Sequence, residues 1–273
     1  MRTRVVGRKA PGGRIPRALL IPALVGLAFI ALPVLALVVR APWSDLGTVA
    51  DDASLTTVLR LSLVSGALAT ALALATGVPL GWLLARGSFR GRSVVRALAL
   101  VPLALPPVVG GLALLLAFGR RGLLGAPLED AGIILPFTLT AAVLAQAFVA
   151  LPFVVLAVEA AVASVDRDLE DVAASLGAGP VRVFVRVTLP LARPGLAAGA
   201  ALAFARALGE FGATVTFAGS VRGKTQTLPL AVYDVLQRDR DQAVLLALVL
   251  LALSALVIVA LRGSFLGGGR SRD

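Results

Sequence analysis

The stretch ALLIPALVGLAFIALPVLALVV, residues 18–39, has 22 residues and no charged side chain. As an α-helix it would be about 33 Å long, enough to cross the hydrocarbon core of a bilayer. Five comparable stretches follow along the chain, at 61–85, 97–119, 131–158, 194–221 and 242–261. We expect the second helix to begin earlier, near Leu55. The sequence therefore predicts an all-α, polytopic membrane bundle with six transmembrane helices.

The composition of the 273-residue chain supports a membrane protein. Hydrophobic residues make up 58%, charged residues 15%, and the mean hydropathy is +0.94, whereas about 25% of residues are charged in typical soluble domains. This composition excludes a disordered chain and a disulfide scaffold, and it argues against a cytosolic enzyme. Because there is no His and no Cys, no imidazole or thiolate can bind a metal and no Ser-His or Cys-His pair can form.

The distribution of basic residues predicts the orientation in the membrane. The N-terminus, the 86–96 and 159–193 loops and the tail together carry 17 Lys and Arg residues, against 7 on the other side. By the positive-inside rule, both termini are expected to be cytoplasmic. The net charge of +11 forms no single stripe interleaved with aromatic residues, so we expect no nucleic-acid partner.

Three regions follow from these spans. They are a basic cytoplasmic N-terminus at 1–17, a transmembrane domain at 18–261 whose core is 55–261, and a cytoplasmic tail at 262–273. We interpret the first span as an uncleaved helix, because the apolar region of a signal peptide has only about 7–15 residues.

The loop at 159–193 is too long for a simple connection and contains an amphipathic segment from Asp168 to Gly177. Its apolar residues recur at i, i+3, i+4 and i+7, on one helical face: Leu169, Val172, Ala173 and Leu176. A helix lying on the negative inner leaflet would be basic, whereas this one is acidic. We therefore expect it to dock into a groove of another protein.

At these residues the chain resembles the EAA loop of ABC-importer permeases, which has an acidic residue, two alanines, a glycine and a closing Leu-Pro. The matching positions here are Asp171, Val172, Ala173, Gly177, Leu189 and Pro190. Because Glu170 is adjacent, either acidic residue can fill the first position. The resemblance implies that the segment couples the chain to an ATPase subunit through Glu170, Asp171, Ala173, Ala174, Leu176 and Gly177.

Three further stretches resemble the molybdate permeases within this family: LPPVVG at 105–110, FGRRG at 118–122, and GEFGATVTFAG with GKTQTLPL within 209–230. The resemblance implies import of molybdate by alternating access across the bacterial cytoplasmic membrane. It also implies two copies of the chain, an ABC ATPase dimer that binds ATP and Mg²⁺, and an extracytoplasmic molybdate-binding protein. No cofactor is expected on this chain itself. Sulfate/thiosulfate permeases share part of the pattern and remain the alternative, and tungstate is not distinguished from molybdate.

Charged residues within the spans are few. Arg206 and Glu210 lie four residues apart on one helical face and can pair. Each alone would cost about 2.5–3.5 kcal/mol at the centre of a transmembrane helix. We favour a structural ion pair, and keep a pathway or gate as the other interpretation. Pro106, Pro107 and Gly110 are candidate gate residues, because helix breaks at membrane depth are tolerated beside protein or a water-filled cavity. Tight helix packing through small residues is the other interpretation of this run.

Two other classes of protein fit less well. An intramembrane enzyme needs catalytic groups at one depth, and only Arg206 and Glu210 are available. A passive channel would not need the docking loop. The stretch 218–225 resembles a phosphate loop but has Ala218 in place of its first glycine, so we do not expect this chain to hydrolyse ATP.

Overall fold

The structure is a computed structural model that describes residues 17–47 and 53–266. Within these residues all regular secondary structure is helical. The chain divides into two compact units, one ending at Ala41 and the other beginning at Pro42. The basic segment 1–16 and the tail from 267 onward lie outside the described residues.

The first unit contains helix α1 (Arg17–Val39), which includes Pro22 and Pro33. Its apolar part, Ala18–Val39, is long enough to cross a membrane. The predicted first span is thus confirmed.

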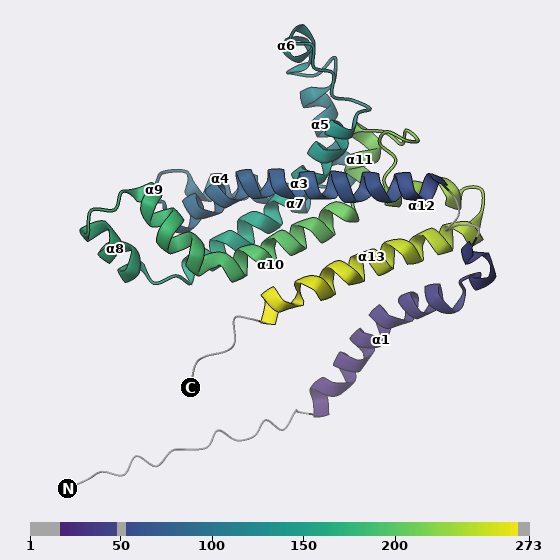
Figure 1. The fold of residues 1–273 in the computed structure, drawn as a ribbon, viewed down its shortest axis with the longest axis horizontal. Coiled ribbons are helices and arrows are strands. Elements are labelled where there is room, and N and C mark those ends of the chain that lie inside the picture. The colour runs from purple at the N-terminus through teal and green to yellow at the C-terminus, as the bar shows by residue number, and fades with distance from the viewer. Residues whose placement is uncertain (1–16, 48–52, 267–273) are drawn as a thin grey trace. The chain divides into compact units, whose positions relative to one another are not determined.

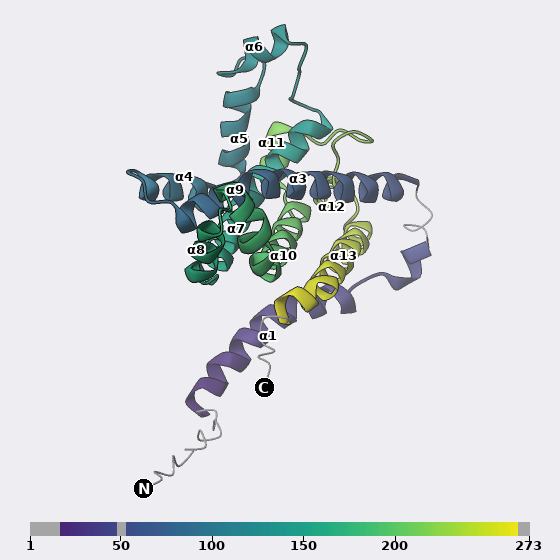
Figure 2. The same ribbon diagram turned by 60° about the vertical axis from the view of Figure 1, so that its left-hand side comes forward.

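The second unit is built around four long helices that pack side by side (Figures 1 and 2). They are α3 (Ala53–Arg86), α7 (Leu139–Ala163), α10 (Leu189–Leu208) and α13 (Arg240–Leu266), and a short 3₁₀ helix η1 (Trp43–Asp45) precedes them. Within the described residues, five helical segments are long and apolar enough to cross a membrane, and a sixth exists only if a bent pair counts as one span.

That bent pair replaces the expected third span, 97–119. Helices α4 (Arg92–Ala104) and α5 (Pro107–Phe118) meet at an angle of 118°. Leu105 and Pro106 between them are extended, with ψ of 133° and 134°, because a residue that precedes proline is disfavoured in the helical region. As a result, α5 turns away from α3 and leads into the short helix α6 (Gly125–Asp130) (Figure 1).

The bounds of two other spans also differ from those expected. The fourth begins at Leu139 rather than 131, because Thr138 caps α7 by accepting a hydrogen bond from the Ala141 N–H at 3.2 Å. The fifth begins at Pro180 with α9 (Pro180–Val183) and the π-helical turn η2 (Phe184–Thr188), and it ends with α10 at Leu208. The expected range 194–221 is therefore wrong at both ends.

Further short helices belong to the second unit. Helix α11 (Gly212–Phe217) follows the break after α10, and α12 (Leu228–Leu236) precedes α13. Helix α12 lies at one end of the long helices, and α8 (Arg167–Ser175) and α9 lie at the other (Figure 1).

Small side chains predominate where α3, α7 and α10 pack together. A Cβ at Gly77 would lie 2.8 Å from Cγ1 of Val154, and one at Gly81 would lie equally close to Val158, so α3 and α7 run in parallel at close range. Helix α10 runs antiparallel to α7, with Gly199 against Ala157. Close approach through small residues is how helices associate in membranes, where packing replaces the hydrophobic effect.

Candidate functional site

The amphipathic segment forms helix α8 for local reasons. The Asp166 carboxylate caps its first turn by accepting a hydrogen bond from the Asp168 N–H at 3.1 Å. Acidic residues in the first turn are also favoured by the helix dipole. The helix stops before Gly177, whose φ of +84° is accessible to glycine at little cost. The predicted helix at this position is confirmed.

The Glu170 carboxylate joins three elements of the second unit. Its Oε2 lies 3.0 Å from Nε of Arg86, the last residue of α3. Its Oε1 accepts hydrogen bonds from the Arg86 guanidinium at 3.3 Å and from the Thr188 hydroxyl in η2 at 2.6 Å. The Arg86 guanidinium also donates to the Val165 carbonyl at 2.8 Å. We call Arg86, Glu170 and Thr188 the latch.

The latch is largely shielded from solvent. The Arg86 and Glu170 side chains are 11% and 15% exposed, and Thr188 is buried. An ion pair that includes a charge-assisted hydrogen bond and is shielded from solvent is stronger than a surface ion pair. It attaches α8 to both α3 and the start of the fifth span. By contrast, the neighbouring Asp171 is exposed.

The other predicted coupling residues lie on the outer side of α8 or beside it. Leu176 is 84% exposed, and Leu169 and Val172 are also exposed. Ala174 and Gly177 are exposed, and Ala173 is half-buried. Helix α8 therefore presents apolar side chains to its surroundings while Glu170 attaches it to the bundle.

The second group of predicted residues lies at the break between α10 and α11. Glu210 is buried, and its Oε2 lies 2.6 Å from Nη1 of Arg206. Its Oε1 accepts a hydrogen bond from the Ala213 N–H at 2.8 Å, at the start of α11. Glu210 thus neutralises Arg206 and also caps α11, as a structural ion pair would.

The structure brings the two predicted gate segments together. A Cβ at Gly111 would lie 2.7 Å from the Ala213 carbonyl oxygen, and one at Gly212 would lie 2.7 Å from Cβ of Pro107. Helices α5 and α11 therefore cross with their backbones in contact. Gly110 is buried against Phe148 of α7, whereas Pro106 and Pro107 are exposed. Arg206 and Glu210 lie just before α11 in the sequence.

In the stretch 218–225, which resembles a phosphate loop, the Thr225 side chain forms hydrogen bonds with the backbone of the same stretch. The Thr225 hydroxyl donates to the Gly219 carbonyl at 3.1 Å and accepts from the Val221 N–H at 2.9 Å. Further along, the Leu228 N–H donates to the Ser62 hydroxyl of α3 at 2.6 Å. These contacts give the Thr-Gln-Thr-Leu-Pro-Leu segment a structural role at the start of α12.

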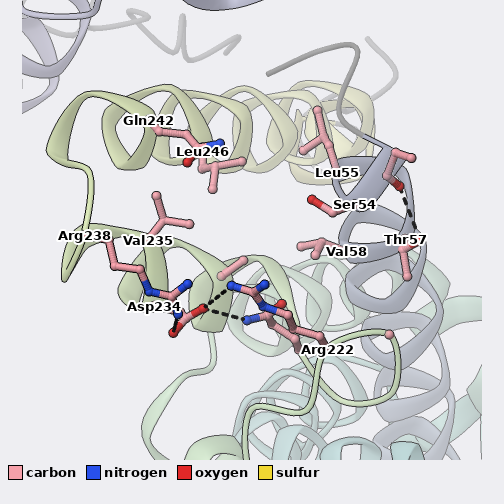
Figure 3. Close-up of a pocket in the computed structure, with 14 residues that line it drawn as sticks. Ser54, Leu55, Thr57, Val58, Arg222, Asp234, Val235, Arg238, Gln242 and Leu246 are labelled. Atoms are coloured by element: carbon pink, nitrogen blue, oxygen red, sulfur yellow. Dashed lines mark hydrogen bonds and ion pairs between the residues drawn. The ribbon is translucent and has the colours of Figure 1, made fainter. Parts of the chain in front are cut away.

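A cavity of about 480 Å³ lies at the α12 end of the bundle, between α12 and the first turns of α3 and α13 (Figure 3). At its edge, the Asp234 carboxylate accepts hydrogen bonds from Arg238 at 2.5 Å and from Arg222 at 3.4 Å. Desolvation raises the pKa of Asp234, but the hydrogen bonds and positive charges of the two arginines outweigh it, so the pKa falls below its usual value. Apolar side chains such as Val58 and Leu246 line the rest of the cavity.

Metal binding has no support in the described ranges, where no three acidic, His or Cys residues form a group that could hold an ion. Two features remain as functional candidates. They are the latched helix α8 at one end and the α5–α11 crossing beside a broken helix. Discontinuous membrane helices of this kind are typical of transporters, and together these features define the membrane domain of a transporter.

Residues 77–265 match the family of inner membrane components of binding-protein-dependent transport systems, and the chain belongs to that family. It is accordingly a multi-pass protein of the inner membrane. The molybdenum transport system permease protein ModB of Mycobacterium tuberculosis is 49% identical over 251 residues, which cover 91% of this chain and 94% of that protein. ModB of Escherichia coli is 46% identical over 178 residues, which cover 65% of this chain and 78% of that protein.

Solved structures agree on the fold. A bacterial alginate ABC transporter, in complex with an alginate pentasaccharide-bound periplasmic protein, matches with a TM-score of 0.73 at 14% identity, covering 94% of this chain and 95% of that one. The inward-facing MetNI methionine ABC transporter matches with a TM-score of 0.56 at 20% identity, covering 85% and 98%. The prediction of an ABC-importer permease fold is confirmed.

Sequence reasoning missed the partners of Glu170. Arg86 was counted only as a topology charge and Thr188 was not considered. They lie 84 and 18 positions from Glu170, and no local pattern links positions so far apart. Gln146 was also missed, although it is the only amide side chain in the 131–158 span and could have been noticed for that reason.

Proposed function

We propose that this chain is the transmembrane permease subunit of an ABC importer for molybdate, with tungstate as a second possible substrate. The observation that carries the proposal is the 49% identity to a molybdenum transport permease along 91% of the chain. Such similarity over nearly the whole length includes both the α8 segment and the α5–α11 crossing. The expected orientation, with α8 on the cytoplasmic side, belongs to the same proposal.

ATP-driven closure of the partner ATPase subunits moves this chain through α8. Two copies of the chain form the pathway, and two ATPase subunits bind ATP and Mg²⁺ below them. The exposed face of α8, with Leu169, Val172 and Leu176, docks into a cleft of the ATPase. When the ATPases close, the latch carries the displacement of α8 to α3 through Arg86 and to the fifth span through Thr188. This chain needs no cofactor of its own.

The displacement then reaches the pathway through α10. Because α10 ends at a break that Glu210 caps, a movement of α10 shifts α11 and with it the crossing on α5. Alternating access requires two arrangements of such elements around one pathway. We assign the gate to this crossing, with Pro106, Pro107, Gly110, Arg206 and Glu210 around it.

Selectivity for the anion belongs to a separate extracytoplasmic binding protein. Arg206, which lies beside the crossing, is already neutralised by Glu210, so its charge is not left to hold a dianion tightly. A pathway that held its substrate tightly would release it slowly. The solved alginate importer, in complex with a substrate-bound periplasmic protein, supports the same division of labour.

The test is uptake of labelled molybdate into proteoliposomes that contain this permease, its ATPase and its binding protein. Uptake that requires ATP and the binding protein, and that persists in excess sulfate, is expected. Proteoliposomes without the binding protein serve as the control. Uptake that sulfate abolishes would instead assign the chain to sulfate/thiosulfate import. Uptake without ATP would contradict an importer of this type.

A further inference from the structure

Gln146 of α7 is fully buried, with an exposed fraction of 0%. Within the described part of the chain, neither its amide nitrogen nor its amide oxygen has a hydrogen-bond partner. Buried polar groups in native proteins are almost always hydrogen-bonded, to protein or to ordered water. An amide with both ends unpaired therefore calls for a bound partner.

Gln146 lies on α7 between two packed faces. One face packs in a cluster with α10, and its members include Ala147, Ala150, Ala203 and Ala207. The other packs in a cluster with α11, and its members include Ala142, Ala145, Ala213 and Phe217. Gln146 is thus on the strip of α7 that faces the junction between α10 and α11.

The register between α7 and α10 gives the same location. The helices are antiparallel, with Gly195 against Ala161 and Gly199 against Ala157. If this register is continued to the end of α10 at Leu208, the last turn of α10 falls opposite residues 148–152 of α7. Ala207 accordingly lies in the same packed cluster as Ala147 and Ala150, so Gln146 lies close to the level at which α10 ends.

Thr214 provides a second, independent observation at this junction. It is fully buried in α11, and its hydroxyl has no hydrogen-bond partner among the described residues. It follows directly after Ala213, whose N–H is bonded to Glu210. An unpaired amide, an unpaired hydroxyl and a buried carboxylate therefore gather where α10 breaks.

We propose that Gln146, Thr214 and Glu210 form a buried water-binding site behind the break between α10 and α11. The amide offers a donor and an acceptor, the hydroxyl offers both, and the carboxylate has acceptor capacity beyond its two bonds. A buried water makes about three hydrogen bonds, which this set supplies. The Arg206 side chain, which pairs with Glu210, is 29% exposed.

Water at this position explains how a helix can be broken at membrane depth. Ordered water can satisfy the backbone groups that a break leaves free. It can also exchange its hydrogen-bond partners when the angle between α10 and α11 changes. The site thus makes the α10–α11 junction a hydrated hinge. This inference does not depend on which anion is transported.

The test is X-ray radiolytic hydroxyl-radical labelling of the full-length chain in lipid nanodiscs. Radicals form from water and modify the nearest aromatic rings. Phe217 is fully buried and packs with Ala213, so bulk solvent does not reach it. We expect Phe217 to be labelled in the wild type and labelled at least fivefold less in a Gln146→Leu/Thr214→Val variant. The exposed Phe137 serves as the dose reference.

Thr70→Val is the matched control. Thr70 is also buried, but its hydroxyl already donates to the Gly66 carbonyl at 2.7 Å, so this variant should leave the labelling of Phe217 unchanged. An unlabelled Phe217 in the wild type would overturn the proposal, and so would equal labelling in the double variant. If the double variant fails to assemble, the milder Gln146→Met replaces it, with the same reduction expected.

Discussion

Glu170 and Asp171 are adjacent carboxylates with opposite surroundings. Glu170 pairs with Arg86 and Thr188 away from solvent, whereas Asp171 is exposed. In the sequence the two were equivalent candidates for the acidic coupling position. Their surroundings now distinguish them: Glu170 attaches α8 to the bundle, and Asp171 is free to meet whatever docks on α8.

Glu170→Gln should weaken the latch, because the amide keeps its shape but loses the charge that Arg86 requires. Hydrogen bonds to charged groups contribute about 1.5–3 kcal/mol each, so we expect a loss of this order in the free energy of unfolding. ATP-driven uptake should fall about tenfold. Thermal unfolding in detergent and proteoliposome uptake measure the two effects.

Asp171→Asn is the matched control for that variant. Since Asp171 is exposed, its substitution should leave the unfolding temperature unchanged. Equal loss of stability in the two variants would contradict the latch.

The lowered pKa of Asp234 predicts a pH dependence at the α12 end. The pKa in the folded protein lies below the usual value of 3.8, so the interaction with Arg222 and Arg238 is fully present above that value. It is lost as the pH falls through the folded pKa. Asp234→Asn should therefore destabilise the protein at pH 6 and make no difference at strongly acidic pH.

The size of this effect should be small. Both arginines are well exposed, and solvent screening limits such pairs to about 1 kcal/mol or less. Thermal unfolding of wild type and variant as a function of pH measures it. A stability difference that stays constant down to pH 3 would contradict the assignment.

At the scale of elements, the crossing of α5 and α11 depends on direct backbone contact. Gly111 and Gly212 allow it, because neither position has room for a side chain. The proline pair that breaks the third span at Leu105 directs α5 toward this contact. The helix that follows the break in the third span, α5, therefore contacts the helix that follows the break after α10, α11.

Gly212→Ala should push α11 away from Pro107, since the added Cβ would lie 2.7 Å from Cβ of that proline. Overpacking of this kind costs about 1–3 kcal/mol, and a displaced crossing should also block uptake. Gly209→Ala is the control, because its Cβ would meet only the Ala205 carbonyl, at 3.7 Å. Membrane abundance and uptake are measured for both, and equal behaviour would contradict a tight crossing.

At the scale of the whole molecule, helices α8 and α12 lie at opposite ends of the long helices (Figure 1). The latch is therefore at one end and the cavity that α12 lines is at the other. In the mechanism we propose, a displacement at α8 reaches the middle of the bundle through the latch and α10. Helix packing with alanine, valine and glycine transmits such movements well, because closely packed interiors have low compressibility.

Docking of the ATPase on α8 can be tested by cysteine protection. The chain has no cysteine, so Leu176→Cys introduces a single thiol at an exposed position. A maleimide should label it in the permease alone, and at least tenfold more slowly in complex with the ATPase. Tyr233→Cys, exposed on α12, should react equally fast in both. Equal labelling of the Leu176 variant in both states would contradict docking on this face.

The local features of this protein could be predicted from the sequence. Uncharged apolar runs indicated the spans, and the period of Leu169, Val172 and Leu176 indicated helix α8, because a helix repeats its side-chain directions every 3.6 residues. The bounds were less predictable. Pro136 lies within the expected fourth span, 131–158, whereas α7 begins only at Leu139. Pro190 lies inside the continuous fifth span, because α10 begins at Leu189 directly after η2.

What the sequence determined by itself is the class of protein: a bundle of apolar helices with an amphipathic loop segment and recognisable permease motifs. Only the tertiary structure decided which residues act together. Arg86 pairs with Glu170 across 84 positions, and Gly111 meets α11. Gln146 is buried on α7 between one cluster that includes α10 and another that includes α11. The physical reason is that periodicity and propensity act over one or two helical turns. Contacts between distant segments depend instead on how whole helices pack.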